Sequence, residues 1–165
     1  MPNVIQRPSP NHGKRPEGVA IDCLVLHADA GRSEEGTLSW LANPASKVSY
    51  HYLVGRTGTV YQCVPDKRRA WHAGVSTFKG RANVNDCSLG VSFANRQDGE
   101  PFPGAQLAAG AQLVADLCRK HAIPLDRITT HAIISPGRKH DPGPLFPLAT
   151  FVRTVGALLS PEPAP

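Results

Sequence analysis

Hydrophobic residues follow two periods along the chain, one typical of strands and one typical of helices. The run from Ile21 to His27 is apolar at nearly every position, as expected for a central strand that is covered on both faces. Two further runs, Ser49 to Val54 and Thr59 to Val64, flank the turn Gly55-Arg56-Thr57-Gly58 and predict a hairpin. Two more strands are predicted over 87–94 and 128–134.

Helical spacing appears in the second half of the chain. Apolar residues from Leu107 to Cys118 recur every three or four positions, which predicts a helix that stops near Pro124. A closing helix is predicted after Pro147, since proline is tolerated in the first helical turn. A short helix is predicted over 37–41. Because helices and strands alternate, the expected fold class is α/β, a single domain with a central mixed β-sheet flanked by helices.

The chain has 165 residues, and this length suits one domain over 1–165. Residues 1–19 carry four prolines and are expected to form an extended lead-in, and 160–165 a flexible tail. No apolar run approaches the roughly 18 residues that a membrane span needs. The first residues lack the apolar stretch of a secretory signal, so we expect synthesis in the cytoplasm and no integral membrane association.

Charge narrows the possible partners. There are 18 Lys and Arg residues against 13 Asp and Glu, a net charge of +5 with a pI near 9.3. Such an excess suits an anionic partner: nucleic acid, a membrane surface or a bacterial wall polymer. The tight basic cluster Lys67-Arg68-Arg69 is expected to be an exposed loop, and we expect no nucleic-acid partner.

The four cysteines show no CxxC pair and no zinc-ribbon spacing. Without an export signal, buried thiols are the expected state, and a disulfide pair is the minority alternative.

Histidine is the more informative residue. His27 stands at the end of the predicted central strand, and such strand ends open onto the ligand crevice in α/β sheets. His131 lies on the late predicted strand and is followed by Arg138-Lys139-His140-Asp141. Two imidazoles plus one carboxylate or thiolate, with an open fourth position, make a catalytic zinc site.

Two residues compete for the third ligand. Pro142 pushes the residue before it out of the helical region, which favours an extended segment over 139–141. Lys139 and Asp141 would then point to one side and His140 to the other. The ligand is therefore either His140 alone or Asp141 with Lys139 beside it, where an ammonium could stabilise an oxyanion. A solvated charged loop is the alternative that assigns no chemistry.

Five segments stand in a recognisable order: LVLH ending at His27, SYHYLVGRTGTVYQ around Tyr50, RRAWHAG around Trp71, then GRANVNDCSLGV and THAIISPGRKHDPGPLF. In this order and spacing the chain resembles the zinc-dependent N-acetylmuramoyl-L-alanine amidases of the type 2 family. That family includes AmpD-like amidases, amidase-type phage lysozymes and peptidoglycan recognition proteins. The resemblance extends from about Ile21 to Phe151.

The resemblance implies one Zn²⁺ ion held by His27, His131 and Asp141. It also implies two catalytic residues: Lys139, which would stabilise the oxyanion, and Tyr50, which would position or activate the water. His51 follows Tyr50 on the same predicted strand and faces the other way, so we interpret it as structural.

Further residues are expected in substrate binding: Trp71, His72, Arg81, Asn85 and Ser92, of which the resemblance favours Arg81 and Asn85. Structural packing is the equal alternative for His72, and a turn-forming role is the alternative for Asn85. Ser92 stands where the AmpD-like branch carries a glutamate that serves as the general base. A serine hydroxyl cannot act as a base near neutral pH without help. Catalysis is then expected to rest on Tyr50, Lys139 and the metal, as in the phage lysozymes.

The implied function is hydrolysis of the amide between N-acetylmuramic acid and L-alanine in peptidoglycan. We expect a monomeric, bacteriolytic phage-type endolysin that reaches the cell wall after release. A cytosolic amidase that recycles anhydro-muropeptides is the alternative. A non-catalytic peptidoglycan-binding module is disfavoured, because such modules generally lose a zinc ligand and this chain keeps all three.

Overall fold

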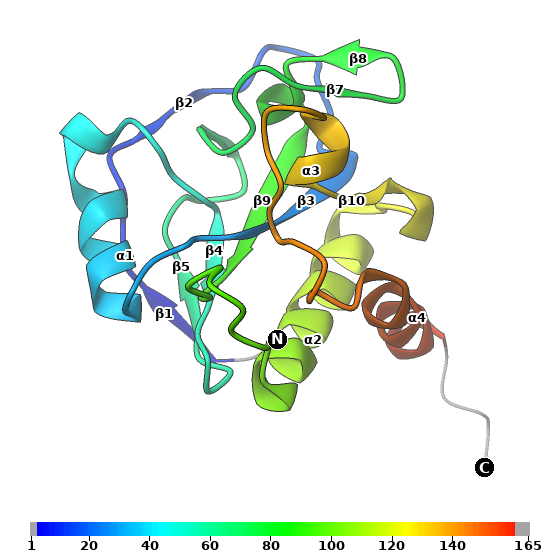
Figure 1. Cartoon of the computed structure of the whole chain (residues 1–165). Coiled ribbons are helices and arrows are strands. Elements are labelled where there is room, and N and C mark those ends of the chain that lie inside the picture. Colours follow the sequence, from blue (N-terminus) through cyan, green and yellow to red (C-terminus); the bar gives the residue numbers. More distant parts are fainter. Residues whose placement is uncertain (1–2, 161–165) are drawn as a thin grey trace.

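A six-stranded mixed sheet forms the centre of the fold in the computed structural model, which describes residues 3–160 (Figure 1). Its strand order is β1-β5-β4-β9-β3-β10, and β4 and β5 are the antiparallel neighbours while the other neighbouring pairs run parallel. In this order the strands are Val4–Gln6, Val60–Gln62, Tyr52–Val54, Ser88–Phe93, Cys23–Ala28 and Ile128–Thr130.

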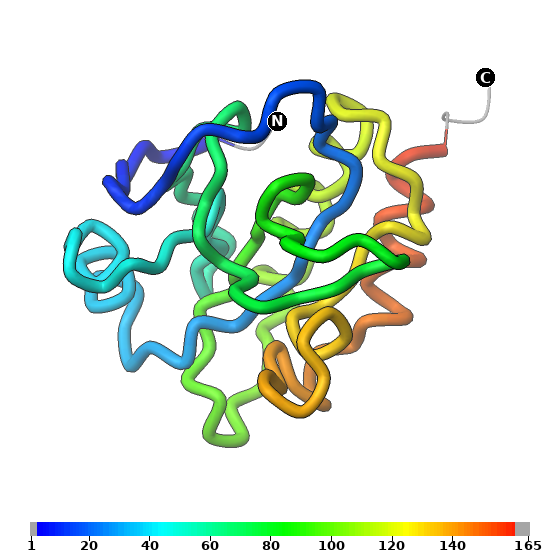
Figure 2. Tube along the Cα trace, turned by 90° about the horizontal axis from the view of Figure 1, so that it is seen from above, coloured from blue at the N-terminus to red at the C-terminus, as the bar shows by residue number. Residues whose placement is uncertain are grey.

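Two helices, α2 (Gly104–His121) and α4 (Leu148–Leu159), pack together against one face of this sheet. Figure 2 shows α4 (red) and α1 (Glu34–Ala42, cyan) at opposite sides of the molecule. Short 3₁₀ helices cover Pro44–Ser46, Val84–Asp86 and Leu125–Arg127. The architecture confirms the predicted α/β class.

Strand β3 is buried along its whole length, as its apolar pattern predicted. Leu24 and Leu26 face the main core beneath α2 and α4. Cys23 and Val25 face the other way, into a smaller apolar cluster that includes Ile134. Since side chains alternate along a strand, His27 lies on the same face as Cys23 and Val25. This second face of the sheet carries the candidate site.

The predicted hairpin, the strand over 87–94 and the three predicted helices are confirmed. The strand predicted over 128–134 is wrong in its second half. It ends at Thr130, whose side chain accepts a hydrogen bond from the Ile133 N–H and caps the helical turn α3 (His131–Ile134). His131 therefore opens a helix instead of continuing the strand.

The first residues form two short strands, whereas the sequence predicted an extended lead-in. β1 pairs with β5, and β2 (His12–Lys14) pairs with β6 (Arg68–Ala70). Part of the basic cluster predicted to be an exposed loop is thus strand β6, and its Arg69 pairs with Asp86. A small hairpin, β7 (Thr77–Phe78) and β8 (Arg81–Ala82), projects at the top of Figure 1.

The end of the predicted tail, 161–165, lies outside the described residues. Within 3–160, none of the helices has the length and apolar character needed to cross a membrane.

His51 is structural, as its place on the strand suggested. The ring is fully buried; its Nδ1 accepts a hydrogen bond from the Gly90 N–H at 2.9 Å, and its Nε2 lies 3.0 Å from the Arg68 carbonyl oxygen. Burial lowers the pKa of His51 to about 3, and the nearby Arg15 guanidinium also disfavours a protonated ring. The imidazole therefore joins three segments of chain as a neutral group.

This burial makes stability depend on pH. His51 titrates near 6.5 when unfolded and near 3 when folded, so its contribution is complete above pH 6.5 and declines as the pH falls toward 3. From this residue alone we expect a loss of about 2 kcal/mol between pH 7 and pH 5. Urea unfolding of the wild type and of His51→Asn at both pH values measures it. The same pH dependence in both proteins would contradict the assignment.

Candidate active site

Parallel strands bring two histidines together. Thr130 of β10 is the register partner of Leu26 of β3, so the next residues along, His131 and His27, arrive side by side at the carboxyl ends of the strands. The third side chain, Asp141, comes from the loop after α3, where its backbone carbonyl accepts the Ala132 N–H at 3.0 Å. Of the two predicted ligand candidates, the structure therefore places Asp141 in the cluster.

His140 points elsewhere. It is exposed and lines a different cavity, with Pro142 and Phe146. His140 is therefore not part of the donor cluster, and its variants can serve as controls for changes at the cluster.

Three donor atoms converge at the site. The Nδ1 atoms of His27 and His131 are 3.1 Å apart, and Asp141 Oδ2 lies 3.2 and 3.3 Å from them. Tetrahedral zinc with bonds of about 2.0–2.2 Å separates its ligands by about 3.3–3.6 Å, close to these distances. Two nitrogens and one carboxylate with a free fourth position are the donors of a catalytic zinc site, so the residues fit this ion.

The protonation states also suit a cation. Burial lowers the pKa of His27 to about 4, so the imidazole is neutral at pH 7. For Asp141, burial acts to raise the pKa, but hydrogen bonds with His131 and His27 hold it well below the ordinary value. Metal ligands must be deprotonated, and both groups already are.

His72 contacts the ring nitrogen of His27 that does not face the other two donors. Its Nδ1 lies 3.0 Å from Nε2 of His27, and its own Nε2 lies 3.1 Å from the Ser88 hydroxyl, which donates to the Val84 carbonyl at 2.6 Å. With Nδ1 of His27 on a metal, its Nε2 carries the proton and donates to His72, which in turn donates to Ser88. The relay therefore fixes the tautomer that a ligand at Nδ1 requires.

Gly90 provides the space for this ring. It lies on β9 opposite Val25, and a Cβ built there would be 2.6 Å from Cγ of His72. Any side chain at this position would displace the imidazole that orients His27.

Replacing His72 with phenylalanine should keep a ring of similar size and remove the relay. We expect zinc affinity to fall about 10–100-fold, as for other residues that orient a metal ligand. Competition with a chromogenic chelator measures the affinity, and circular dichroism checks the fold. His140→Phe is the matched control. An unchanged affinity in folded His72→Phe would show that the relay does not orient the ligand.

A cavity of about 410 Å³ opens beside the three donors. It is lined by two of them, His131 and Asp141, and by Trp71 and Tyr50, among others. Three cationic side chains also line it: Lys47, Arg138 and Lys139. Arg138 has a second role, since its guanidinium donates to the carbonyl oxygens of Ala73 and Val75 and so ties that loop to the end of α3.

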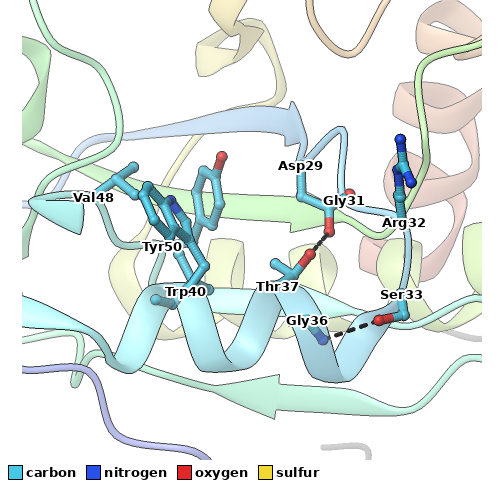
Figure 3. A pocket seen from close by; sticks show the side chains of 10 residues that line it. Asp29, Gly31, Arg32, Ser33, Gly36, Thr37, Trp40, Val48 and Tyr50 are labelled. Atoms are coloured by element: carbon cyan, nitrogen blue, oxygen red, sulfur yellow. Dashed lines mark hydrogen bonds between the residues drawn. The ribbon is translucent and has the colours of Figure 1, made fainter. Parts of the chain in front are cut away.

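A second cavity, of about 370 Å³, adjoins the first along α1 (Figure 3). The two share Asp29, Val48 and Tyr50. Figure 3 shows the rings of Trp40 and Tyr50 on one side of this cavity and Arg32 on the other. Trp40 is 56% exposed although it is large and apolar. The candidate cleft thus consists of a cavity beside the donors with three cationic side chains and a cavity along α1 that holds Trp40 and Arg32.

Tyr50 lines both cavities. Its ring centroid is 5.1 Å from that of His27. Burial and the nearby carboxylates of Asp141 and Asp29 raise the pKa of the Tyr50 phenol. The phenol is therefore protonated at neutral pH. Lys139, the other predicted catalytic residue, is exposed and lines the cavity next to Asp141.

Three predicted substrate-binding residues are placed differently from the expectation. Arg81 lines neither cavity, because its hairpin projects from the fold and its guanidinium pairs with Asp22 at 3.0 Å. Ser92 is fully buried on β9 opposite His27 and also lines neither. Asn85 lines the first cavity, but its Oδ1 accepts the backbone N–H groups of His72 and Ala73, so it positions that loop. Trp71 and His72 line the first cavity, so their predicted part in substrate binding stays a prediction.

Several lining residues were not predicted: Asp29, Trp40, Lys47, Gln97 and Arg138. Arg138 stands beside Lys139 and Trp40 is an exposed aromatic on a helix, so both carried a detectable signal. Lys47 and Gln97 lie in loops with no pattern that separates them from other polar residues.

Comparison with known proteins relates this geometry to a family. The family described as N-acetylmuramoyl-L-alanine amidase matches residues 17–144. The 1,6-anhydro-N-acetylmuramyl-L-alanine amidase AmpD of Enterobacter cloacae is 35% identical over 161 residues, 87% of this chain and 86% of that protein. The N-acetylmuramoyl-L-alanine amidase AmiD of Escherichia coli K12 is 35% identical over 142 residues, 77% of this chain, which spans about half of AmiD's length (50%).

Solved structures agree with the sequence comparison. An AmpD crystal structure superposes with a TM-score of 0.79 at 30% identity, covering 94% of this chain and 96% of that one. E. coli AmiD in complex with the substrate anhydro-N-acetylmuramic acid-L-Ala-D-γ-Glu-L-Lys gives 0.75 at 32% identity, covering 86% and 60%. A mutant endolysin from Bacillus subtilis gives 0.71 at 25% identity, covering 94% and 100%.

Proposed function

Since this chain belongs to the N-acetylmuramoyl-L-alanine amidase family, we propose that it hydrolyses the amide between N-acetylmuramic acid and L-alanine with one zinc ion at His27, His131 and Asp141. The convergence of these three donors, 3.1–3.3 Å apart at the strand ends, carries the proposal. All three lie within the part of the chain that matches the family.

A zinc ion held there would lower the pKa of a water molecule to about 7 and polarise the substrate carbonyl. The chain's own residues supply the rest. The Lys139 ammonium, at the rim beside Asp141, would stabilise the negative charge that develops on the carbonyl oxygen. The protonated Tyr50 phenol would orient the attacking water by hydrogen bonding.

Ser92 determines which group can act as the base in the reaction. It stands where the AmpD-like branch carries a glutamate, and a buried hydroxyl cannot replace a carboxylate as a base near neutral pH. We therefore assign no proton transfer to Ser92 and leave it to Tyr50 and the water, as in the branch of the family that lacks the glutamate.

Side chains that line the two cavities suit the stem peptide and the sugar of the substrate. Stem peptides carry carboxylates, which the cationic side chains Lys47, Arg138 and Lys139 would attract. Sugar rings present apolar faces, which the exposed Trp40 ring could cover. The muropeptide in the AmiD structure supports a ligand of this class.

For the setting, we propose a phage-type endolysin that acts on the intact wall after release from the cytoplasm. The net charge of +5 suits a polyanionic wall, and Ser92 matches the branch that contains phage lysozymes. The recycling alternative, with a soluble anhydro-muropeptide as substrate, is favoured by the similarity to AmpD over most of both chains.

Mass analysis of products from two substrates, intact sacculi and soluble anhydro-muropeptide, tests both the amidase activity and the choice between the endolysin and recycling roles. We expect zinc-loaded protein to release peptides with a free L-alanine amine from intact sacculi. Efficient cleavage of soluble anhydro-muropeptide alone would favour recycling. No cleavage of either substrate by folded, zinc-loaded protein would overturn the amidase proposal.

A further inference from the structure

Two cysteines lie close together on the face of the sheet that carries the candidate site. Cys23 opens β3, four residues before His27, and Cys87 immediately precedes β9. Their Sγ atoms are 4.0 Å apart within a small apolar cluster. The other two cysteines, Cys63 and Cys118, are also buried free thiols, but each belongs to a different cluster of the core. The chain thus contains one close thiol pair and two separate thiols as internal controls.

Charged groups at the pair favour a nucleophilic sulfur over a cation site. The adjacent Cys23 thiol and the positive charge of the half-exposed Arg81 lower the pKa of Cys87, although burial acts against them. The neighbouring carboxylate of Asp22 already pairs with Arg81 at 3.0 Å and with Arg127 at 3.4 Å. The guanidinium groups of Arg81 and Arg127, which lie beside the Asp22 carboxylate, would repel a metal cation from the two thiols and this carboxylate.

We propose that Cys23 and Cys87 form a redox modification site, at which hydrogen peroxide joins them in an intramolecular disulfide. The Cys87 sulfur attacks one peroxide oxygen; an S–O bond forms, the O–O bond breaks, and the leaving hydroxide takes the proton of the Cys87 thiol to become water. The Cys23 sulfur then attacks the Cys87 sulfur; the S–S bond forms, the S–O bond breaks and water leaves with the proton from Cys23. Overall, two thiols and one peroxide yield one disulfide and two waters.

The geometry requires only a local movement. The sulfurs must approach from 4.0 Å to about 2.05 Å, and Cys23 is the register partner of Ser88, the residue that follows Cys87. Cys23 and Cys87 are 1% and 3% exposed, whereas the Arg81 guanidinium that lowers the pKa of Cys87 is about half exposed, so peroxide would enter from the Arg81 side.

The disulfide would act on the support of His27. Cys87 ends the 3₁₀ helix from which Asn85 holds the backbone of His72, and it precedes Ser88, which contacts the His72 ring. A bond to Cys23 would tie this support to β3, the strand that carries His27. We therefore expect slower zinc release from the oxidised protein. This consequence rests on the proposed zinc site, whereas the disulfide does not.

The test treats the full chain with stoichiometric hydrogen peroxide, then alkylates under denaturing conditions and measures intact mass and peptides. We expect the labelled thiols to fall from four to two, an intact mass lower by about 2 Da before alkylation, and a Cys23–Cys87 linked peptide. Cys63→Ser and Cys118→Ser should still form the link. In Cys23→Ser, Cys87 should accumulate as a sulfenic acid that a dimedone reagent traps, and Arg81→Gln should slow the reaction.

Four free thiols after treatment, or oxidation of Cys63 and Cys118 at the same rate as Cys87, would overturn the proposal. Neither result depends on amidase activity, so failure here is distinguishable from failure of the proposed function. Chelator-driven zinc release from the oxidised and reduced proteins then tests the consequence.

Discussion

Replacing Asp141 with alanine is expected to abolish zinc retention and reduce amidase turnover to background. Asp141 supplies the only charged donor of the three, and its Oδ2 lies within 3.3 Å of both imidazole nitrogens. Two neutral imidazoles alone neither neutralise the ion nor complete the set of three protein ligands that catalytic zinc sites use. Zinc content after dialysis and the rate of peptide release measure the two effects together.

His140→Ala is the control for this variant. It alters the preceding residue, whose exposed side chain faces a different cavity, and should leave zinc content and turnover near wild type. Retention of one zinc per chain by Asp141→Ala would remove Asp141 from the metal centre.

Replacing Lys139 with alanine is expected to leave zinc bound and lower kcat about 10²–10³-fold, the usual effect of removing one oxyanion-stabilising group. Lys139 lines the cavity beside Asp141, but its ammonium cannot serve as a ligand while it is protonated. The loss should fall on kcat more than on KM, because the charge it stabilises develops only in the transition state. Steady-state kinetics on a soluble muropeptide separates the two constants.

Lys139→Arg, which keeps the charge, should retain more turnover than Lys139→Ala. Equal zinc loss in Lys139→Ala and Asp141→Ala would refute the division of roles between ligand and oxyanion stabiliser.

Prediction from the sequence was most accurate where the hydrophobic pattern matches the burial of the strand in the structure. The run before His27 is buried on both faces of the sheet, and its pattern predicted this. The placement of His27 at a strand end follows from that pattern. That Asp141 joins the two histidines was predicted from the backbone preference before Pro142 and from the family resemblance together. The structure brings these groups within 3.3 Å of one another.

Other features could not be predicted because tertiary contacts determine them. β1 and β2 have three residues each, too few for a periodic pattern, and they exist because β5 and β6 offer pairing partners. The end of β10 depends on the Thr130 cap, which overrides the strand preference of Ile133 and Ile134. Arg81 was assigned to the substrate by resemblance, but its hairpin projects from the fold and directs it to Asp22.

The relay behind His27 shows a further limit of sequence analysis. His72, Ser88 and Gly90 are distributed over two segments, and nothing in their spacing indicates that the glycine makes room for the imidazole. Only the packing of one segment on the other reveals that His72 has a role in orienting a ligand.

The most direct test is anomalous diffraction at the zinc edge from crystals of the zinc-loaded protein. The account predicts one strong peak about 2.0–2.2 Å from Nδ1 of His27, Nδ1 of His131 and a carboxylate oxygen of Asp141, with the fourth position free of protein atoms. A peak elsewhere, or a fourth protein ligand closing the site, would contradict it.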